Sequence, residues 1–190
     1  MQDFCKNKTD EELVKLSLQK QDYFLCLMEK YEGRLISYVM RISSFNREDA
    51  EDVLQEVFVK AYFNLNNFDT KLKFSSWIYR ITHNQTISQF RKNKVRPLFY
   101  FEENDLILLI DKFNLSKEVD DGFLKEKVLE VLQKMDKKYS EVLVLKFLED
   151  KDYKEISDIL KKPTGTVGTL INRAKTKFKN EFLKYEGKSQ

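Results

Sequence analysis

Residues 153–178, YKEISDILKKPTGTVGTLINRAKTKF, decide the fold of the second half of the chain. Asp152 and Glu155 form a capping-box pattern, so a short amphipathic helix is expected to begin there and to end near Leu160. Two lysines and a proline then interrupt the helical pattern. From Thr164 a second helix is expected, with small residues at its start and bases further on. Two helices joined by a tight turn, the second of them basic, predict a helix-turn-helix.

The second of these helices has an apolar and a polar face. Its apolar residues recur at three- and four-residue steps, as in a buried stripe: Val167, Ile171, Ala174 and Phe178. Its polar face carries Thr164, Thr166, Thr169, Asn172, Arg173 and Lys175. Helix N-terminal N–H groups and hydroxyls bind phosphates, and Asn or Arg side chains read base edges in the major groove. The pattern predicts a DNA-binding surface, and the alternative is a three-helix packing module with a basic surface.

The glycines of this stretch raise the question of a phosphate-binding loop. Such a loop requires the pattern G-x-x-x-x-G-K-[ST] after a strand. Counted from Gly165, the place of the second glycine is taken by Leu170, and no strand is expected before it. The sequence therefore argues against a phosphate-binding loop.

The composition of the whole chain predicts an all-α fold of one medium or two small domains. The 190 residues include 34% charged and 42% hydrophobic residues, with a net charge of +3. Five glycines, two prolines and many Lys, Glu and Leu residues favour helices. No apolar run is long enough to cross a membrane, and the N-terminal MQDFCKNKTDEE has no apolar signal segment, so a cytoplasmic protein is expected. Cys5 and Cys26 predict neither a disulfide framework nor a metal-ligand spacing.

Charged residues are unevenly distributed along the chain. Residues 80–96 carry five bases and no acid, and residues 161–184 carry seven bases against one acid. Between them, residues 97–126 carry eight acids and three lysines. Two separate basic patches indicate two contacts with a polyanion, whereas solvated helical faces are the alternative.

The first domain is expected over residues 9–93. Thr9 and Glu12 form a capping-box pattern, and Asn46 can cap a later helix. Apolar residues at helical spacing predict long helices over about 22–43, 47–65 and 74–92, with a loop at 66–73.

Residues 94–122 lose clear periodicity, which predicts a linker between the domains. This linker is acidic, and one segment of it, LILLI (106–110), is apolar enough to pack against another element. The second domain is expected over residues 123–185, with two helices ahead of the helix-turn-helix.

No catalytic residue, cofactor or metal is expected. The single histidine, His83, has no cysteine near it and sits in a basic helix, so it is expected at the surface. Asp49, Asp52 and Glu56 lie on one helical face and could bind a divalent cation, but no second acidic helix is evident to complete its shell. A protein-docking face or a solvated face suits these acids better.

Residues 74–94, FSSWIYRITHNQTISQFRKNK, interleave aromatic rings with bases. Trp77 is expected in the core. The other faces are crowded by Tyr79, Arg80, His83, Asn84, Ile87, Phe90 and Arg91. Nucleic-acid bases stack on rings while Arg and Lys neutralise phosphates, so this helix suits single-stranded nucleic acid. A charged helix with incidental aromatics is the alternative.

Three motifs in this order resemble the extracytoplasmic-function (ECF) group of bacterial sigma factors. DAEDVLQEVFVKAY (49–62) resembles the helix that docks on the clamp coiled coil of the largest subunit of core RNA polymerase. Residues 74–94 resemble the segment that melts and reads the promoter −10 element, and residues 153–178 resemble the −35-reading helix-turn-helix. The resemblance implies a two-domain, all-helical alternative sigma factor that directs polymerase to promoter DNA and catalyses nothing itself.

The resemblance also implies a role for each surface. The residues that would contact core RNA polymerase are Asp49, Asp52, Gln55 and Glu56. A flipped −10 base and its neighbouring strand would be held by Asn66, Asn67, Phe68, Lys73, Arg80, Asn84, Arg91 and Lys92. The −35 duplex would be read by the polar face of the last helix. The acidic linker would thread polymerase channels that otherwise carry nucleic acid, and association with polymerase would bring the protein to the nucleoid.

Some positions depart from the pattern of the group. Lys161 and Lys162 stand where a small-residue turn with glycine is usual, and Ser88 stands where Asp is usual. Gly168 and Leu170 stand where bases are common, which predicts fewer charged contacts with the −35 element. The rival class is a stand-alone helix-turn-helix regulator, which needs no polymerase-docking face. An anti-sigma protein is a further candidate partner.

Overall fold

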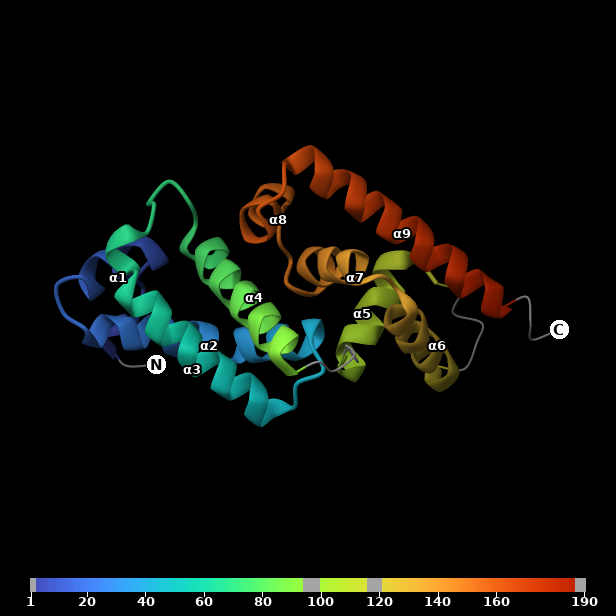
Figure 1. Ribbon diagram of the computed structural model, residues 1–190, viewed down its shortest axis with the longest axis horizontal. Helices are drawn as coiled ribbons and strands as arrows, with labels where there is room; N and C mark the ends of the chain where they lie inside the picture. Colours follow the sequence, from blue (N-terminus) through green and yellow to red (C-terminus); the bar gives the residue numbers. More distant parts are fainter. Residues whose placement is uncertain (1–2, 94–99, 116–120, 187–190) are drawn as a thin grey trace. The chain divides into compact units, whose positions relative to one another are not determined.

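The structure is a computed structural model that describes residues 3–93, 100–115 and 121–186. All regular secondary structure within these ranges is helical, which confirms the predicted all-α fold (Figure 1). The chain divides into two compact units, one built mainly from residues up to 95 and the other mainly from the residues after it. No helix in the described ranges is long and apolar enough to span a membrane.

The described part of unit 1 is a bundle of helices. Its elements are η1 (Asp3–Cys5), α1 (Asp10–Ser17), α2 (Asp22–Ile42), α3 (Arg47–Phe63), η2 (Leu65–Asn67) and α4 (Phe74–Asn93). Two helix starts are capped as the sequence predicts. Thr9 Oγ1 accepts from the Glu12 N–H at 3.2 Å, and Asn46 Oδ1 accepts from the Asp49 N–H at 2.8 Å. Each cap satisfies an N–H group that the first helical turn cannot pair internally.

Helices α3 and α4 pack along each other in unit 1. In α3, the buried residues Val53, Val57 and Ala61 recur at four-residue steps, and each is at most 1% exposed. In α4, Ile78 is fully buried and Trp77 nearly so. Burying such a face contributes roughly 25 cal/mol for each Å² of apolar surface removed from water, and this term orients both helices.

The loop between α3 and α4 turns an aromatic side chain inward. Phe68 is 7% exposed, and its ring centroid lies 5.9 Å from that of Phe74 and 5.3 Å from that of Trp77. The expectation that Phe68 contacts DNA is therefore corrected, because its side chain belongs to the core of unit 1. Burying a large apolar ring in the core lowers the free energy of the folded state more than leaving it in a polar, solvated loop does.

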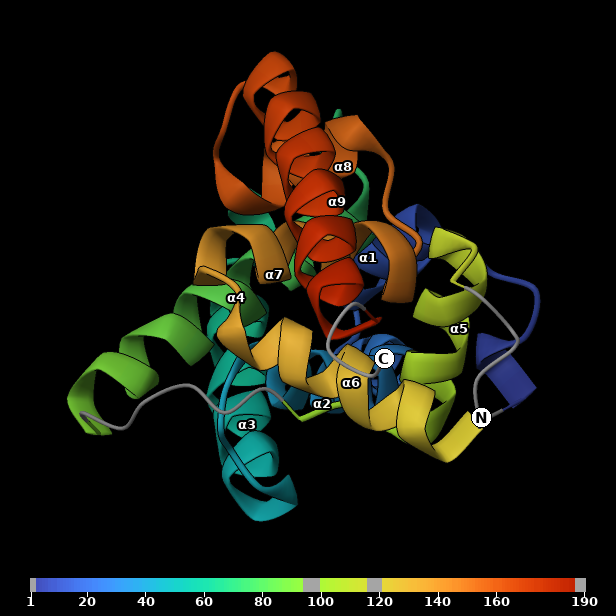
Figure 2. The same ribbon diagram turned by 90° about the vertical axis from the view of Figure 1, so that its right-hand side faces the viewer.

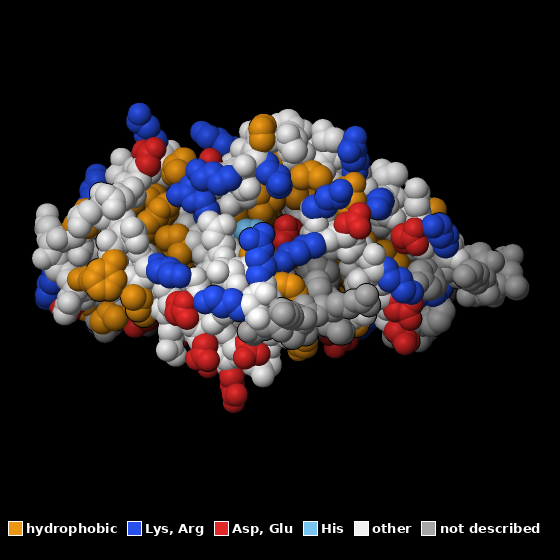
Figure 3. Space-filling view, in the orientation of Figure 1, with side chains coloured by type: hydrophobic (Ala, Val, Ile, Leu, Met, Phe, Trp, Pro, Cys, Tyr) orange, Lys and Arg blue, Asp and Glu red, His pale blue; other side chains and the backbone are white. Residues whose placement is uncertain are grey.

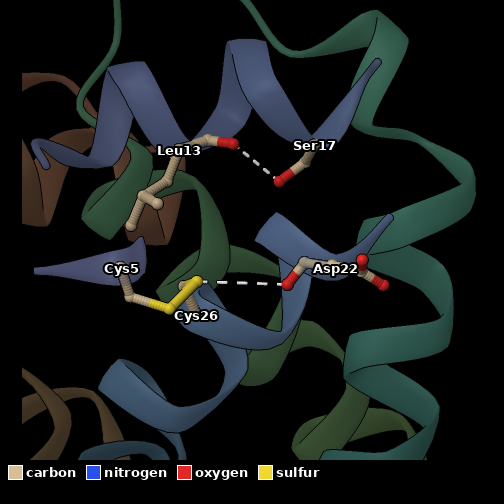
Figure 4. Close-up of a disulfide and its surroundings, with 5 residues drawn as sticks. All are labelled: Cys5, Leu13, Ser17, Asp22 and Cys26. Atoms are coloured by element: carbon tan, nitrogen blue, oxygen red, sulfur yellow. Dashed lines mark hydrogen bonds between the residues drawn. A yellow bond between two sulfur atoms is a disulfide. The ribbon is translucent and has the colours of Figure 1, made fainter. Parts of the chain in front are cut away.

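A disulfide joins Cys5 of η1 to Cys26 of α2, so the sequence analysis was wrong to give these cysteines no disulfide (Figure 4). Their Cα atoms lie 5.7 Å apart, which is within the reach of a disulfide. The two residues are 21 positions apart in the chain. Their pairing depends on η1 folding back onto α2, and no spacing rule reveals that contact.

Unit 2 holds the remaining helices. These are α5 (Glu103–Phe113), α6 (Asp121–Lys134), α7 (Lys137–Leu143), the π-helical turn η3 (Val144–Leu148), α8 (Tyr153–Leu160) and α9 (Thr164–Glu186). The long helix α9 lies against α6 and α7, as Figure 2 shows. The predicted stripe of α9 is buried, since Val167, Ile171, Ala174 and Phe178 are each at most 1% exposed.

Helix α5 lies within the stretch that the sequence analysis treated as a linker. Its apolar side does pack, as the LILLI segment suggested, because Leu106, Leu109 and Ile110 are buried. The ring centroid of Phe113 lies 4.6 Å from that of Phe178 and 5.4 Å from that of Phe147. The helix ends at Asn114, which adopts a left-handed conformation with φ 50°. A helix, which was not predicted, therefore occupies part of this stretch. The other parts of the expected linker, residues 94–99 and 116–120, lie outside the described residues.

The burial of Phe68 predicts a stability effect. Phe68→Ala should lower the free energy of unfolding by about 3–5 kcal/mol, because it removes a packed ring and leaves a cavity. Urea denaturation followed by circular dichroism measures this change. Asn67→Ala, at the exposed neighbouring position, is the matched control and should change the free energy by less than about 0.5 kcal/mol. Equal effects for the two variants would contradict the placement of Phe68 in the core.

Glu141 of α7 is a buried acid with a shifted pKa. Its side chain is 12% exposed, and the Nζ of Lys137 lies 3.9 Å from its carboxylate. Burial raises the pKa of the Glu141 carboxyl, and Lys137 and Lys162 oppose this rise only in part. The folded state then binds this proton more tightly than the unfolded state. The stability that comes from this tighter proton binding is fully present below the pKa that Glu141 has in the unfolded state. It is lost as pH rises through the pKa that Glu141 has in the folded state.

We therefore expect Glu141→Gln to raise the melting temperature at pH 7. Near about pH 4 it should change the melting temperature little, because the Glu141 carboxyl is then protonated in the folded state and mostly protonated in the unfolded state. Thermal denaturation at the two pH values measures the difference. Glu126→Gln makes the same charge change at an exposed position of α6 and serves as the control. A melting temperature for Glu141→Gln that is lower at pH 7 than that of the unchanged protein would contradict this account.

Candidate functional site

The turn between α8 and α9 is built by hydrogen bonds and one unusual backbone angle. The Glu155 N–H donates to Asp152 Oδ1 at 2.7 Å, which confirms the predicted cap of α8. At the other end, Lys161 adopts the left-handed conformation with φ 52°, where glycine is usually preferred. Ser157 Oγ donates to the carbonyl oxygen of Lys162 at 2.6 Å and closes the turn. A lysine thus occupies the left-handed position of this helix-turn-helix, where glycine is usual.

The polar face of α9 is exposed along the first half of the helix. The six predicted residues on it are all exposed: Thr164, Thr166, Thr169, Asn172, Arg173 and Lys175. Thr169 Oγ1 donates to the carbonyl oxygen of Gly165 at 3.0 Å, so its lone pairs face outward as acceptors. The structure therefore exposes all six residues, which spread over the part of α9 that its buried stripe leaves open.

An aromatic ring of α8 lies beside the start of α9, and the sequence analysis missed it. A Cβ atom built at Gly168 would lie 3.6 Å from Cε2 of Tyr153, which is an ordinary van der Waals contact. Tyr153 is 40% exposed, and the Nζ of Lys146 lies 5.7 Å from its ring centroid. The missing side chain at Gly168 leaves this ring accessible next to the polar face of α9. Its signal in the sequence is only the tyrosine at the start of α8.

Two bases of α4, Arg80 and Arg91, lie on one side of that helix together with Asn84. Arg80, Asn84 and Arg91 follow at steps of four and seven; Arg80 is half-buried, and the other two are exposed, as is Lys92. Figure 3 shows Lys and Arg side chains on the visible face of both units. The remaining bases of this patch, Lys94 and Arg96, lie outside the described residues.

Most aromatic rings of α4 are buried and are therefore not available for stacking with nucleic-acid bases. Tyr79 is 1% exposed, and its ring centroid lies 5.0 Å from that of Tyr38. Phe90 is half-buried, with its ring 6.4 Å from that of Phe45. His83 is also half-buried and shares a hydrogen bond of 3.0 Å with the hydroxyl of Tyr38, which corrects its expected surface position. The predicted alternation of rings and bases therefore reduces to a basic polar surface.

The loop after α3 keeps its polar residues outside. Asn66, Asn67 and Lys73 are exposed, whereas Phe68 between them is buried. The Lys71 N–H donates to Asp69 Oδ1 at 3.0 Å, and this bond shapes the middle of the loop.

The acidic face of α3 is exposed, as the sequence predicts. Asp49, Asp52, Gln55 and Glu56 are all exposed on it. Glu56 accepts a hydrogen bond from the amide of Gln85 in α4, and the same amide accepts one from Lys60. Gln85 is 8% exposed, so a buried amide of α4 fixes the side chains on the outer face of α3.

Apolar residues continue this face, and the sequence analysis missed them. Val59 and Phe63, one and two turns beyond Gln55 and Glu56, are 56% and 76% exposed. A groove of about 530 Å³ opens between α2 and α3, and Phe24, Phe58 and Tyr62 contribute to its lining. Figure 3 shows hydrophobic side chains gathered over unit 1. Exposed apolar residues at four-residue steps beside acids are a signal that the sequence did contain.

Acidic residues in the described part of the chain do not form a metal site. No group of three or more His, Cys, Asp or Glu side chains there is arranged to hold a metal ion. Asp49 instead serves the cap of α3, where its carboxylate accepts from the Asn46 N–H at 3.3 Å.

The chain shares sequence families and folds with known proteins. Residues 27–96 match the family Sigma-70 region 2, and residues 125–178 match the family Sigma-70, region 4. In fold, the chain resembles CnrH in the structure of its complex with the cytosolic domain of CnrY, with a TM-score of 0.64, 22% identity and coverage of 90% of this chain and 95% of that one. It also resembles the sigma factor RpoE in complex with the anti-sigma factor NepR from Bartonella quintana, with a TM-score of 0.58, 18% identity and coverage of 88% and 98%.

Curated relatives match over most of their length. The ECF RNA polymerase sigma factor SigW of Bacillus subtilis is 33% identical over 173 residues, which cover 85% of this chain and 90% of the relative. The ECF RNA polymerase sigma-E factor of Haemophilus influenzae is 28% identical over 187 residues, which cover 92% and 95%. These matches span both units, and the chain belongs to the ECF group of RNA polymerase sigma factors.

Proposed function

We propose that this sigma factor docks on core RNA polymerase through α3 and reads promoter DNA through α4 and α9. One observation carries the proposal most directly: an exposed face of α3 combines acids, an amide and large apolar side chains on one helix. A stand-alone DNA-binding regulator has no use for such a face. The match of residues 27–96 to Sigma-70 region 2 also disfavours that alternative.

The docking face suits a partner helix with basic and apolar residues. Asp52 and Glu56 supply charge, and Phe63 supplies a ring that is 76% exposed to water in the free protein. Contacts of this composition usually place a desolvated apolar centre within a polar rim. We assign the clamp coiled coil of the largest polymerase subunit to this face, with Asp49 and Gln55 at its edge.

The −10 contact combines the loop after α3 with the basic side of α4. Asn66, Asn67 and Lys73 of the loop are exposed, as a pocket for a flipped base requires. Arg80, Asn84, Arg91 and Lys92 then hold the neighbouring strand by its phosphates. With Tyr79 and Phe68 in the core, this contact relies on polar and ionic groups rather than on stacking.

The −35 contact places the start of α9 in a major groove. Asn172 and Arg173 reach base edges, while Thr164, Thr166, Thr169 and Lys175 bind the backbone. Tyr153 adds a ring beside Gly168, at a place where the group often has charge. Two weak contacts on one chain reinforce each other, because the first to form raises the effective concentration of the second.

Regulation through a protein partner follows from the same surfaces. The structural neighbours CnrH and RpoE were each solved with a bound protein partner, which for RpoE is an anti-sigma factor. We infer that an anti-sigma protein can hold this chain away from polymerase. The chain itself acts without catalysis, in the cytoplasm, and reaches the nucleoid through polymerase.

Run-off transcription tests the proposed function. The full chain is added to core polymerase from the same cell and to a library of genomic promoter fragments. Specific transcripts that require both the chain and core polymerase are expected. If the chain binds specific DNA equally well with and without core polymerase and yields no transcript, the stand-alone regulator is the correct class.

Charge reversal on α3 should abolish docking. Asp52→Arg combined with Glu56→Arg removes two carboxylates from the face and adds two cations, so co-purification with core polymerase is expected to fall by at least about tenfold. Helical circular dichroism should stay unchanged, because both residues are exposed. Glu126→Arg with Glu130→Arg in α6 makes the same change of charge at the same spacing and is the matched control. Undiminished co-purification of the α3 variant would refute this docking face.

Restoring charge at the start of α9 should steepen the salt dependence of promoter binding. Gly168→Arg is compatible with the fold, since its Cβ atom would meet Tyr153 at an ordinary distance of 3.6 Å. With Leu170→Arg added, the slope of log K against log salt concentration should become more negative by up to about two, or roughly 0.9 for each phosphate contact. The measurement is binding of the polymerase complex to promoter DNA at several salt concentrations. An unchanged slope would contradict the view that these positions lack phosphate contacts.

A further inference from the structure

The Cys5–Cys26 disulfide is a feature that neither docking nor DNA reading uses. It joins η1 to the second turn of α2, and both residues are at most 1% exposed. Figure 4 shows the bond beside α1, whose Leu13 side chain points toward it. The bond therefore lies inside unit 1, where three helical elements meet.

A permanent disulfide does not suit the proposed function, on which this inference rests. Core RNA polymerase works inside bacterial cells, where low-molecular-weight and protein dithiols keep cysteines reduced. Disulfides that do form there are usually transient and serve catalysis or redox sensing. A pair of cysteines placed within bonding distance in such a protein points to a bond that opens and closes.

We propose that Cys5 and Cys26 form a reversible thiol–disulfide site, and that the oxidised chain binds core polymerase more tightly than the reduced chain. The bond sets the position of η1, and η1 in turn supports the start of α2. Phe4, next to Cys5, packs edge-on against Tyr23 of α2, with ring centroids 5.3 Å apart.

The start of α2 also forms part of the groove beside the docking face. Phe24 lines this groove, and its ring centroid lies 5.2 Å from that of Tyr62 and 6.4 Å from that of Phe58. Phe24 thus directly follows Tyr23, on which η1 packs, and precedes Cys26 by two positions. When the bond opens, a three-residue 3₁₀ turn is left to hold itself against α2, and such short elements open easily. The first turn of α2, and with it Phe24, then loses part of its support.

The rest of unit 1 keeps its own connections when the bond opens. Asp10 of α1 accepts a hydrogen bond from the hydroxyl of Tyr31 and forms an ion pair of 2.5 Å with Lys30, both in α2. Leu13 and Leu27 remain in the core at 0% and 1% exposure. Reduction therefore releases η1 without unfolding the bundle, and the effect is local to the start of α2.

The chemistry is a pair of thiol–disulfide exchanges. In reduction, one thiolate of a dithiol attacks Cys5 or Cys26, the bond between the two protein sulfurs breaks, and the other cysteine leaves as a thiolate that takes a proton. The second thiol of the dithiol then closes its own disulfide and releases the first cysteine, so two electrons pass to the protein. A small-molecule disulfide reverses the sequence and leaves as two thiols. Because both sulfurs are buried, each exchange waits for local opening of η1.

The test compares the two redox states of the full chain. One sample is oxidised with glutathione disulfide and the other is reduced with dithiothreitol, and both are freed of reagent. Intact mass after alkylation reports the state of the cysteines. Binding to core polymerase is then measured by fluorescence anisotropy, and the oxidised chain is expected to bind about five- to tenfold more tightly, as partial loss of one apolar contact implies.

Cys5→Ser with Cys26→Ser is the control variant. It should bind like the reduced chain and should not respond to either reagent, which also excludes an effect through thiols of the polymerase. Should that variant fail to fold, Cys5→Ala with Cys26→Ala also removes both thiols, keeps the buried site apolar and gives the same comparison.

The outcomes separate this proposal from the proposed function. If both redox states bind polymerase with equal affinity, or if alkylation shows that the bond never forms, the redox site is refuted and the docking function stands. If neither state binds polymerase, the docking function itself is refuted, and this proposal falls with it. Tighter binding of the oxidised chain, absent in the serine variant, supports the proposal.

Discussion

The packing of α3 along α4 is the contact on which the rest of unit 1 depends. Each of these helices has one face in the core and a different set of side chains on the outside. Val53, Val57 and Ala61 bury one side of α3, which leaves its acids and its exposed apolar residues on the outer side. The same contact directs the bases of α4 outward. Gln85 crosses between the helices and fixes Glu56, so the two outer surfaces are held by one buried amide.

In unit 2, the long helix α9 likewise has one side in the core and one side exposed. The stripe of α9 packs against α6 and α7, and Phe178 extends the core toward Phe113 of α5. This anchoring leaves the first half of α9 free of packing on its polar side. The turn before it depends on Lys161 in a left-handed conformation, which costs a non-glycine residue about 1 kcal/mol. Hydrogen bonds of Ser157 to the turn offset this cost.

Local signals predicted much of this structure. Capping-box patterns at Thr9 and Asp152 and the capping residue Asn46 placed three helix starts, and periodic apolar residues placed the stripe of α9. These features depend on residues within a few positions of each other, which a sequence displays directly. The order of the three motifs was equally visible, and it led to the family.

The features that the sequence did not reveal depend on contacts between distant residues. Phe68, Tyr79 and the pair Cys5 and Cys26 acquire their roles only when other elements close over them. Aromatic residues are ambiguous for the same reason, since a ring can serve the core or a partner equally well. Helix α5 was not predicted because its apolar stripe is only a few positions long and lies among acidic residues, between segments without clear periodicity.

The bare position at Gly168 has a consequence for competition among sigma factors. In a bacterium, several such factors share one limited supply of core polymerase. A factor with Gly168 and Leu170 at these positions would make fewer counterion-releasing contacts with its duplex than one with bases there. As the ionic strength of the cell rises under osmotic stress, its share of productive complexes at promoters would fall less than that of its more basic competitors.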